Sequence, residues 1–225
     1  MGSDKWNNIM YIKHPTPYNG LAGKIEKFRS KEIMYFIQKN KKRHNFTLLE
    51  VGCEAGNLLG SISRRFRSAE LIGVDISDVA LKKARTNLKD EIKLIKLDIT
   101  HQPLKLNKNI DFLICSETLE HILNVKKAIE NLAKSCTNET ILIITVPNEK
   151  LKNLIKIILN KLKVFDLFFK GIEKGFSEWH LQDFSKEEIL KLLSQQFKII
   201  KYKNILFLHH LIVLRNISNK VNLKR

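Results

Sequence analysis

The chain has 225 residues, 44% of them hydrophobic and 28% charged, a balance typical of a globular domain and unlike that of a disordered chain. Cys53, Cys115 and Cys136 are odd in number and lack C-x-x-C spacing, so neither a disulfide framework nor a zinc site is expected. The net charge of +17 admits a polyanionic partner, and no apolar run reaches the length of a membrane span.

The first part of the chain predicts an irregular segment, a helix and a strand. Residues 1–22 contain the turn signals HPTP and YNG and are expected to be irregular. Residues 24–39 carry apolar side chains at helical spacing and predict a helix. The apolar run 46–51 predicts a strand that bears Glu50 near its end, and Gly52 and Gly56 follow before a helical pattern begins at Asn57.

Strands and helices then alternate. We expect strands over 71–74, 92–97, 110–115, 141–148 and 205–214, and helices over 58–66, 79–88 and 125–135. Asp75 and Asp98 each follow a strand, and the fourth strand leads into the segment SETLEHI. This alternation is typical of a parallel sheet with helices on both faces, which binds ligands at the carboxyl ends of its strands.

Residues 151–170 predict a helix whose apolar side is wider than packing against the sheet requires, while lysines occupy the opposite side. Two interpretations stay open. The helix is either a lid packed over a substrate pocket or a cationic helix that lies in a membrane surface, and the two are compatible.

The motifs together resemble those of the class I S-adenosylmethionine-dependent methyltransferases, and most closely the ubiquinone-biosynthesis O-methyltransferase type. The resemblance rests on the E-x-G-C-x-x-G turn, the E-x-x-E-H-I segment and the later W-H-L-Q-D-F-S-K-E-E segment, and it spans roughly residues 40–205. It implies an α/β, Rossmann-like, seven-stranded and mostly parallel sheet with helices on both faces and a helical insert after the fifth strand. We expect one domain over 1–225, with a cap segment at 1–40, an insert or lid at 149–180 and a basic tail at 215–225.

The resemblance also implies which residues hold the cofactor, S-adenosylmethionine. Glu50 would orient the methionine end, Asp75 the ribose and Asp98 the adenine amino group. The remaining positions implied to line the cofactor are Gly52, Gly56, Ile76, Ile99 and Ser116. For Asp75 and Asp98 the alternative is a capping role at the following helix or turn. Glu54 replaces the glycine that the family usually has in the middle of the turn. Two outcomes stay open: the Glu54 side chain points outward at little cost, or it weakens cofactor binding.

The segment 116–121 is where the family assists methyl transfer. His121 is the candidate general base, with Glu117 beside it, and the alternative for His121 is a purely structural hydrogen bond. Glu117, Glu120, His121 and His180 also match the metal tetrad of small-RNA 2′-O-methyltransferases. The same motif occurs in small-molecule relatives, so we predict no bound metal.

The expected function is therefore methylation of a small or lipid-like molecule, at oxygen, by a cytoplasmic protein; peripheral attachment to an anionic membrane surface through 151–170 is the alternative location. A second candidate is an RNA 2′-O-methyltransferase, which the net charge favours. Only eight of the 40 basic residues are arginines, which recognise phosphate best, so nucleic acid is a weak candidate. A third candidate is a cofactor-binding protein without catalysis.

Overall fold

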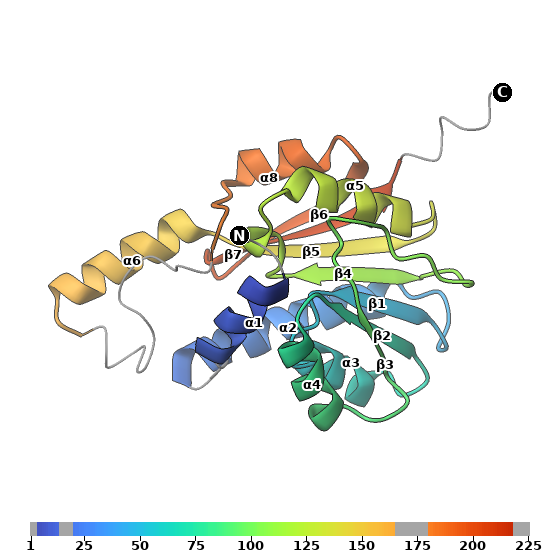
Figure 1. Cartoon of the computed structure of the whole chain (residues 1–225). Coiled ribbons are helices and arrows are strands. Elements are labelled where there is room, and N and C mark those ends of the chain that lie inside the picture. The colour runs from blue at the N-terminus through green and yellow to red at the C-terminus, as the bar shows by residue number, and fades with distance from the viewer. Residues whose placement is uncertain (1–3, 14–19, 165–179, 218–225) are drawn as a thin grey trace.

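The computed structural model describes residues 4–13, 20–164 and 180–217, and its centre is one seven-stranded sheet (Figure 1). The strand order is β3-β2-β1-β4-β5-β7-β6, in which β7 alone runs antiparallel to the other strands. The strands are β1 (Thr47–Val51), β2 (Glu70–Asp75), β3 (Lys93–Lys96), β4 (Phe112–Ser116), β5 (Ile141–Pro147), β6 (Phe197–Ile205) and β7 (His209–Asn216). The fold class expected from the sequence is confirmed.

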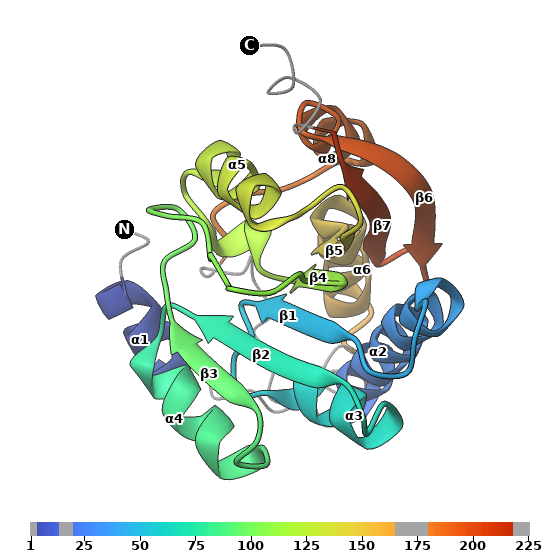
Figure 2. The ribbon, with the colours of Figure 1, turned by 90° about the vertical axis from the view of Figure 1, so that its right-hand side faces the viewer.

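Helices cover both faces of the sheet (Figure 2). One face carries α2 (Gly20–Asn40), α3 (Asn57–Arg65) and α4 (Asp78–Asn87), and the other carries α5 (Val125–Ser135) and α8 (Lys186–Leu193). Each face has its own apolar core, so β1, β4 and β5 are buried on both sides. This explains why these strands are continuous apolar runs in the sequence.

The N-terminal residues differ from the expectation. The sequence predicts that the segment 1–22 is irregular, but residues 4–13 form helix α1 (Asp4–Lys13) and residues 20–22 belong to the first turn of α2. Residues 1–3 and 14–19, which include HPTP, lie outside the described residues. Helix α1 packs on α4, where Asn8 Oδ1 accepts hydrogen bonds from Ser77 Oγ at 2.5 Å and from Val79 N at 3.3 Å. The weak apolar periodicity of α1 did not predict a helix. In the structure, α1 makes a tertiary contact with the N-terminus of α4.

The end of the chain differs as well. The predicted strand 205–214 contains a turn at 206–208, with β6 before it and β7 after it. Arg215 and Asn216 belong to β7, and the buried Asn216 amide donates to the carbonyls of Ala133 and Cys136. The basic tail expected from 215 onward therefore starts later, and residues 218–225 lie outside the described part of the chain.

Helix α6 (Glu149–Lys161) follows β5 and extends away from the sheet beyond its carboxyl end (Figure 1). Glu149 is its one buried residue, while Leu154, Ile158 and Ile157 are about half exposed, at 51%, 47% and 48%. The predicted helix is thus present at the expected edge of the sheet. The apolar run continues to Phe165 and Phe169, which lie outside the described residues. Within the described chain, no helix combines the length and apolarity needed to cross a membrane.

Candidate active site

The turn after β1 is built around two glycines in the left-handed region. Gly52 has φ 77° and Gly56 has φ 80°. A Cβ at Gly52 would lie 2.2 Å from Thr118 Oγ1, and one at Gly56 would lie 2.5 Å from Leu88 Cδ1. Both positions therefore require glycine for backbone conformation and for close packing against neighbouring loops.

The amides of this turn are bonded within the protein. Gly52 N and Cys53 N donate to the carbonyl of Val74 at 2.7 Å and 3.0 Å, and Glu54 N donates to Asp75 Oδ2 at 3.0 Å. The turn thus fastens the ends of β1 and β2 together. Its ligand-binding capacity comes from carboxylates more than from free amides, which suits a cationic ligand better than a phosphate.

Those carboxylates are Glu50, Glu54 and Asp75. Glu50 is 3% exposed, and no hydrogen-bond partner is recorded for its Oε2 among the described residues. Burial, followed by the nearby charges of Glu54 and Asp75, raises the pKa of Glu50 well above its usual value. Burial also raises the pKa of Asp75 to about 6, although Asp75 accepts amide hydrogen bonds from Ser77 and Glu54.

This set of hydrogen-bond acceptors fits the expected cofactor. S-adenosylmethionine carries an ammonium and two ribose hydroxyls, which donate hydrogen bonds to carboxylates, and a sulfonium, whose positive charge a nearby carboxylate stabilises. The unpartnered oxygen of Glu50 offers one such acceptor, and a carboxylate that already accepts two amides, as in Asp75, still has unused lone pairs.

Glu54 occupies a position whose backbone suits glycine. Its φ is 51°, in the left-handed region that side chains rarely adopt, and its side chain is partly buried. The structure therefore explains why the family usually has glycine here. The negative charge of Glu54 contributes to the raised pKa of Glu50. Glu54 therefore adds a second negative charge beside the expected methionine end of the cofactor.

The adenine side of the expected site is occupied by a local hydrogen-bond network. Asp98 Oδ1 accepts from Thr100 N at 2.8 Å and from Thr100 Oγ1 at 2.6 Å, and Oδ2 lies 2.8 Å from His101 Nδ1. Ile99 is buried in the core at 5% exposure, and Ile76 is partly buried. The turn-stabilising role of Asp98 is thus present, and its adenine contact stays a prediction.

Glu117 lies at the centre of a second polar network, directly after β4. Its Oε2 lies 3.2 Å from Arg29 Nη1 in α2 and 3.1 Å from His209 Nε2 in β7. Lys152 Nζ of α6 is 3.9 Å away. Thr145 Oγ1 donates to Glu117 Oε1 at 3.0 Å, so Ser116 Oγ donates in turn to Thr145 at 2.8 Å. Residues from α2, β5, β7 and α6 therefore converge on one carboxylate.

This network keeps Glu117 ionised. Burial alone would raise the pKa of Glu117, but His209 and Arg29 hold it well below the usual range. Burial lowers the pKa of His209, so a neutral ring that donates its Nε2 proton to Glu117 satisfies both groups. Such a carboxylate is a poor proton acceptor and a good anchor. Neither Arg29 nor His209 belongs to a recognisable motif, and sequence reasoning missed both.

Glu120, His121 and His180 form a separate group. Each offers a ligand atom, and these atoms lie within 4.8 Å of one another. The amides of Leu181 and Gln182 donate to the Glu120 carbonyl at 2.7 Å and 3.0 Å, which brings His180 to this place. The rings of His121 and His180 are 4.9 Å apart. The structure therefore brings together three members of the tetrad considered above, while Glu117 faces Arg29 and His209.

Glu120 is the most constrained member of this group. It is 1% exposed, and neither carboxylate oxygen has a recorded hydrogen-bond partner among the described residues. Burial, with the charge of Glu117 adding to it, raises the pKa of Glu120 well above its usual value. Burial and the charge of Glu117 therefore favour the protonated form of Glu120.

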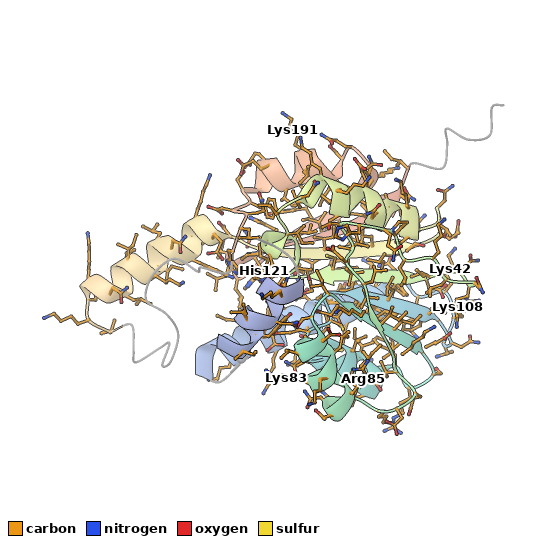
Figure 3. The ribbon with its side chains drawn as sticks, viewed as in Figure 1. Lys42, Lys83, Arg85, Lys108, His121 and Lys191 are labelled. Atoms are coloured by element: carbon orange, nitrogen blue, oxygen red, sulfur yellow. The ribbon has the colours of Figure 1, made fainter. Side chains whose placement is uncertain are left out.

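The positive charge is dispersed over the molecule. Figure 3 labels His121 at the carboxyl end of the sheet, while Lys191, Lys83 and Lys42 lie on α8, on α4 and near the opposite end. Several lysines pair with carboxylates, as Lys96 does with Asp78. This distribution matches lysines scattered over solvated faces better than one nucleic-acid-binding surface.

Comparison with known proteins gives a consistent result. The family described as "Methyltransferase domain" matches residues 21–197. The ubiquinone biosynthesis O-methyltransferase of Rickettsia prowazekii is 25% identical over 198 residues, which cover 84% of this chain and 75% of the relative. A malonyl-[acyl-carrier protein] O-methyltransferase of Priestia megaterium is 22% identical over 200 residues, which cover 87% and 72%.

A solved structure shares the fold. The magnesium protoporphyrin IX methyltransferase of Synechocystis PCC 6803, crystallised with bound SAH, superposes with a TM-score of 0.62 over 96% of both chains. Its sequence is 16% identical, so the likeness concerns the fold.

The network around Glu117 gives a stability prediction. Arg29→Met leaves the Glu117 carboxylate, whose side chain is only 17% exposed, without its closest permanent cation, so we expect a loss of about 2 kcal/mol in the free energy of unfolding. Arg43→Met removes the more exposed pair with Asp111 and should cost less than about 1 kcal/mol. Urea unfolding measures both losses, and equal losses would contradict the special role of the less exposed pair of Arg29 and Glu117.

Proposed function

Because this chain belongs to the methyltransferase-domain family and is an S-adenosylmethionine-dependent enzyme, we propose that it methylates an oxygen atom of a small or lipid-like molecule. The observation that supports this most directly is the set of buried carboxylates at adjacent strand ends, with His121 on the next loop. Two relatives that are named as O-methyltransferases support oxygen as the acceptor atom.

In this proposal the carboxyl edge holds the cofactor through its carboxylates. Glu50 accepts from the ammonium, whose positive charge favours the ionised carboxylate and so offsets the effect of burial on its pKa. Asp75 accepts from the ribose hydroxyls, and Asp98 with Ile76 and Ile99 borders the adenine. Gly52, Gly56 and Ser116 shape the remaining wall. The bound cofactor supplies an activated methyl group, so the protein's own task is to align the acceptor and remove its proton.

His121 is the proposed proton acceptor. Imidazole is the side chain that most often serves as a general base, and it can accept the proton of an acceptor hydroxyl at a ring nitrogen. Glu117 is better suited to positioning, because Arg29 and His209 keep it weakly basic. Through Thr145 and Ser116 it fixes the end of β4, from which the loop with His121 departs.

A lipid-like acceptor is supported by α6. Its exposed apolar side chains lie at the edge of the sheet that carries the proposed site, and lysines share the same helix. We propose that this helix attaches the enzyme to an anionic membrane surface by dipping its apolar side into the interface, with its lysines near head groups.

A divalent-cation-dependent RNA 2′-O-methyltransferase is the second candidate. The grouping of Glu120, His121 and His180 favours it, because one carboxylate and two imidazoles can hold a cation. The engagement of Glu117 by Arg29 and His209 and the dispersed lysines disfavour it.

The first prediction concerns pH. Because the pKa of Asp75 is raised to about 6, its carboxyl is largely protonated in the free protein below pH 6, whereas the ribose hydroxyls donate hydrogen bonds to the ionised form. The affinity for S-adenosylhomocysteine should therefore rise from pH 5 to 7, by up to about tenfold per pH unit, and then level off. Asp75→Asn should bind more weakly and lose the part of the profile centred near pH 6. Calorimetry that gives identical profiles for both proteins would refute the ribose contact.

The second prediction concerns metal. We expect exhaustive chelation to leave the rate of methyl transfer unchanged, since Glu117 is held away from the other three residues. Glu120→Gln should then retain activity without added metal. Activity that chelators abolish and Mn²⁺ restores, in the wild type but not in Glu120→Gln, would establish the cation-dependent alternative.

The third prediction concerns α6. Leu154→Gln with Ile158→Gln removes two apolar side chains that are about half exposed, while keeping good helix formers. We expect this variant to sediment with phosphatidylserine-containing vesicles at least about tenfold less than the wild type. Ile200→Gln, at a 44% exposed position on β6, is the matched control. Equal sedimentation of all three proteins would argue against membrane attachment through α6.

A further inference from the structure

The turn between β6 and β7 has an unusual composition for its conformation. Leu208 N donates to Ile205 O at 2.9 Å, which closes a four-residue turn. The two central residues, Leu206 and Phe207, have φ 50° and 61°. Positive φ at both central positions is the pattern of a type I′ turn, which Asn-Gly adopts readily and which bulky side chains disfavour.

The same two side chains are exposed. Leu206 is 48% exposed and Phe207 is 72% exposed, the highest value for a large apolar side chain in the described chain. Backbone strain and apolar exposure both act against the stability of the isolated protein. A segment that combines a strained backbone with exposed apolar side chains is typical of a functional site.

This turn is fastened to the start of α6. Asn148 N donates to Leu208 O at 2.8 Å, Asn148 Nδ2 donates to Phe207 O at 3.1 Å, and Asn148 Oδ1 caps α6 by accepting from Leu151 N. The turn and α6 therefore leave the sheet at the same end, as Figure 1 shows. The bonds from Asn148 also satisfy two carbonyls of the turn, which lowers the cost of placing its backbone in a poorly hydrated interface.

We propose that Leu206 and Phe207 form a second membrane anchor, which inserts beside α6 into the interface of an anionic bilayer. This inference rests on the membrane attachment proposed above. Two anchors, one at each side of Asn148, fix the orientation of the enzyme so that the carboxyl edge of the sheet faces the lipid. A lipid-like acceptor then reaches His121 without crossing bulk water.

Charge favours a bilayer over a second copy of the chain as the occupant of this surface. The exposed lysines Lys150, Lys161 and Lys163 lie on or directly after α6, and the whole chain carries a net charge of +17. Two such surfaces would repel one another, whereas anionic head groups complement them.

The test is a variant that improves the turn while it removes the anchor. Leu206→Asn with Phe207→Gly introduces the Asn-Gly pair that a type I′ turn prefers. We expect its melting temperature to equal or exceed that of the wild type, and its affinity for S-adenosylhomocysteine to be unchanged. Sedimentation with vesicles of phosphatidylserine and phosphatidylcholine should fall by about tenfold or more. Ile200→Gln again serves as the control, with no expected change.

The outcomes separate this inference from the proposal on which it rests. Unchanged vesicle binding by the turn variant, with binding lost in the α6 variant, would overturn the second anchor alone. Absence of vesicle binding by the wild type would overturn the membrane attachment as a whole. A dimer of the wild type that becomes a monomer in the turn variant, seen by analytical ultracentrifugation, would overturn the bilayer as occupant in favour of a second copy.

Discussion

The carboxylate of Asp75 is the constraint on which the arrangement of the site depends. It accepts one amide from the turn after β1 and one from the start of α4, and so holds two strand ends in a fixed relation. The same carboxylate is buried, and its pKa is raised to about 6. A group that joins two loops at the cost of its own desolvation is preorganised for a ligand that donates hydrogen bonds to it. Glu50 is also buried, and its Oε2 has no hydrogen-bond partner among the described residues, so this oxygen can accept a hydrogen bond from a ligand.

The surroundings of each acidic residue at the carboxyl edge of the sheet determine which protonation state is favoured. Glu117, next to Arg29 and the neutral His209, stays ionised, while the raised pKa of Glu120 favours its protonated form. Two carboxyls three positions apart in one segment therefore differ in charge because different elements pack against them. Since Glu117 serves as an ionised anchor and burial favours the protonated form of Glu120, His121 is the residue on this loop that we propose as the proton acceptor.

Much of the architecture could be predicted from the sequence. Strands β1, β4 and β5 are buried on both faces of the sheet and therefore appear as continuous apolar runs, and glycines mark the turn after β1. Helix α1 could not be predicted because its apolar side chains have only weak helical periodicity. Its contact with the start of α4, through Asn8, depends on the tertiary structure and cannot be read from the sequence. The turn at Leu206 and Phe207 was hidden inside an apolar run, because it lacks the usual turn residues. The partners of Glu117 come from distant strands and helices, and only the tertiary fold brings them together.

The central claim is that the carboxylates at the ends of β1 and β2 hold the methyl donor in front of His121. A crystal structure of the protein with S-adenosylhomocysteine tests it most directly. The account predicts ribose hydroxyls within hydrogen-bond distance of Asp75, the ammonium at Glu50, and an open space between the thioether sulfur and His121 in which an acceptor oxygen fits. A cofactor that is bound elsewhere, or one whose sulfur faces away from His121, would contradict it.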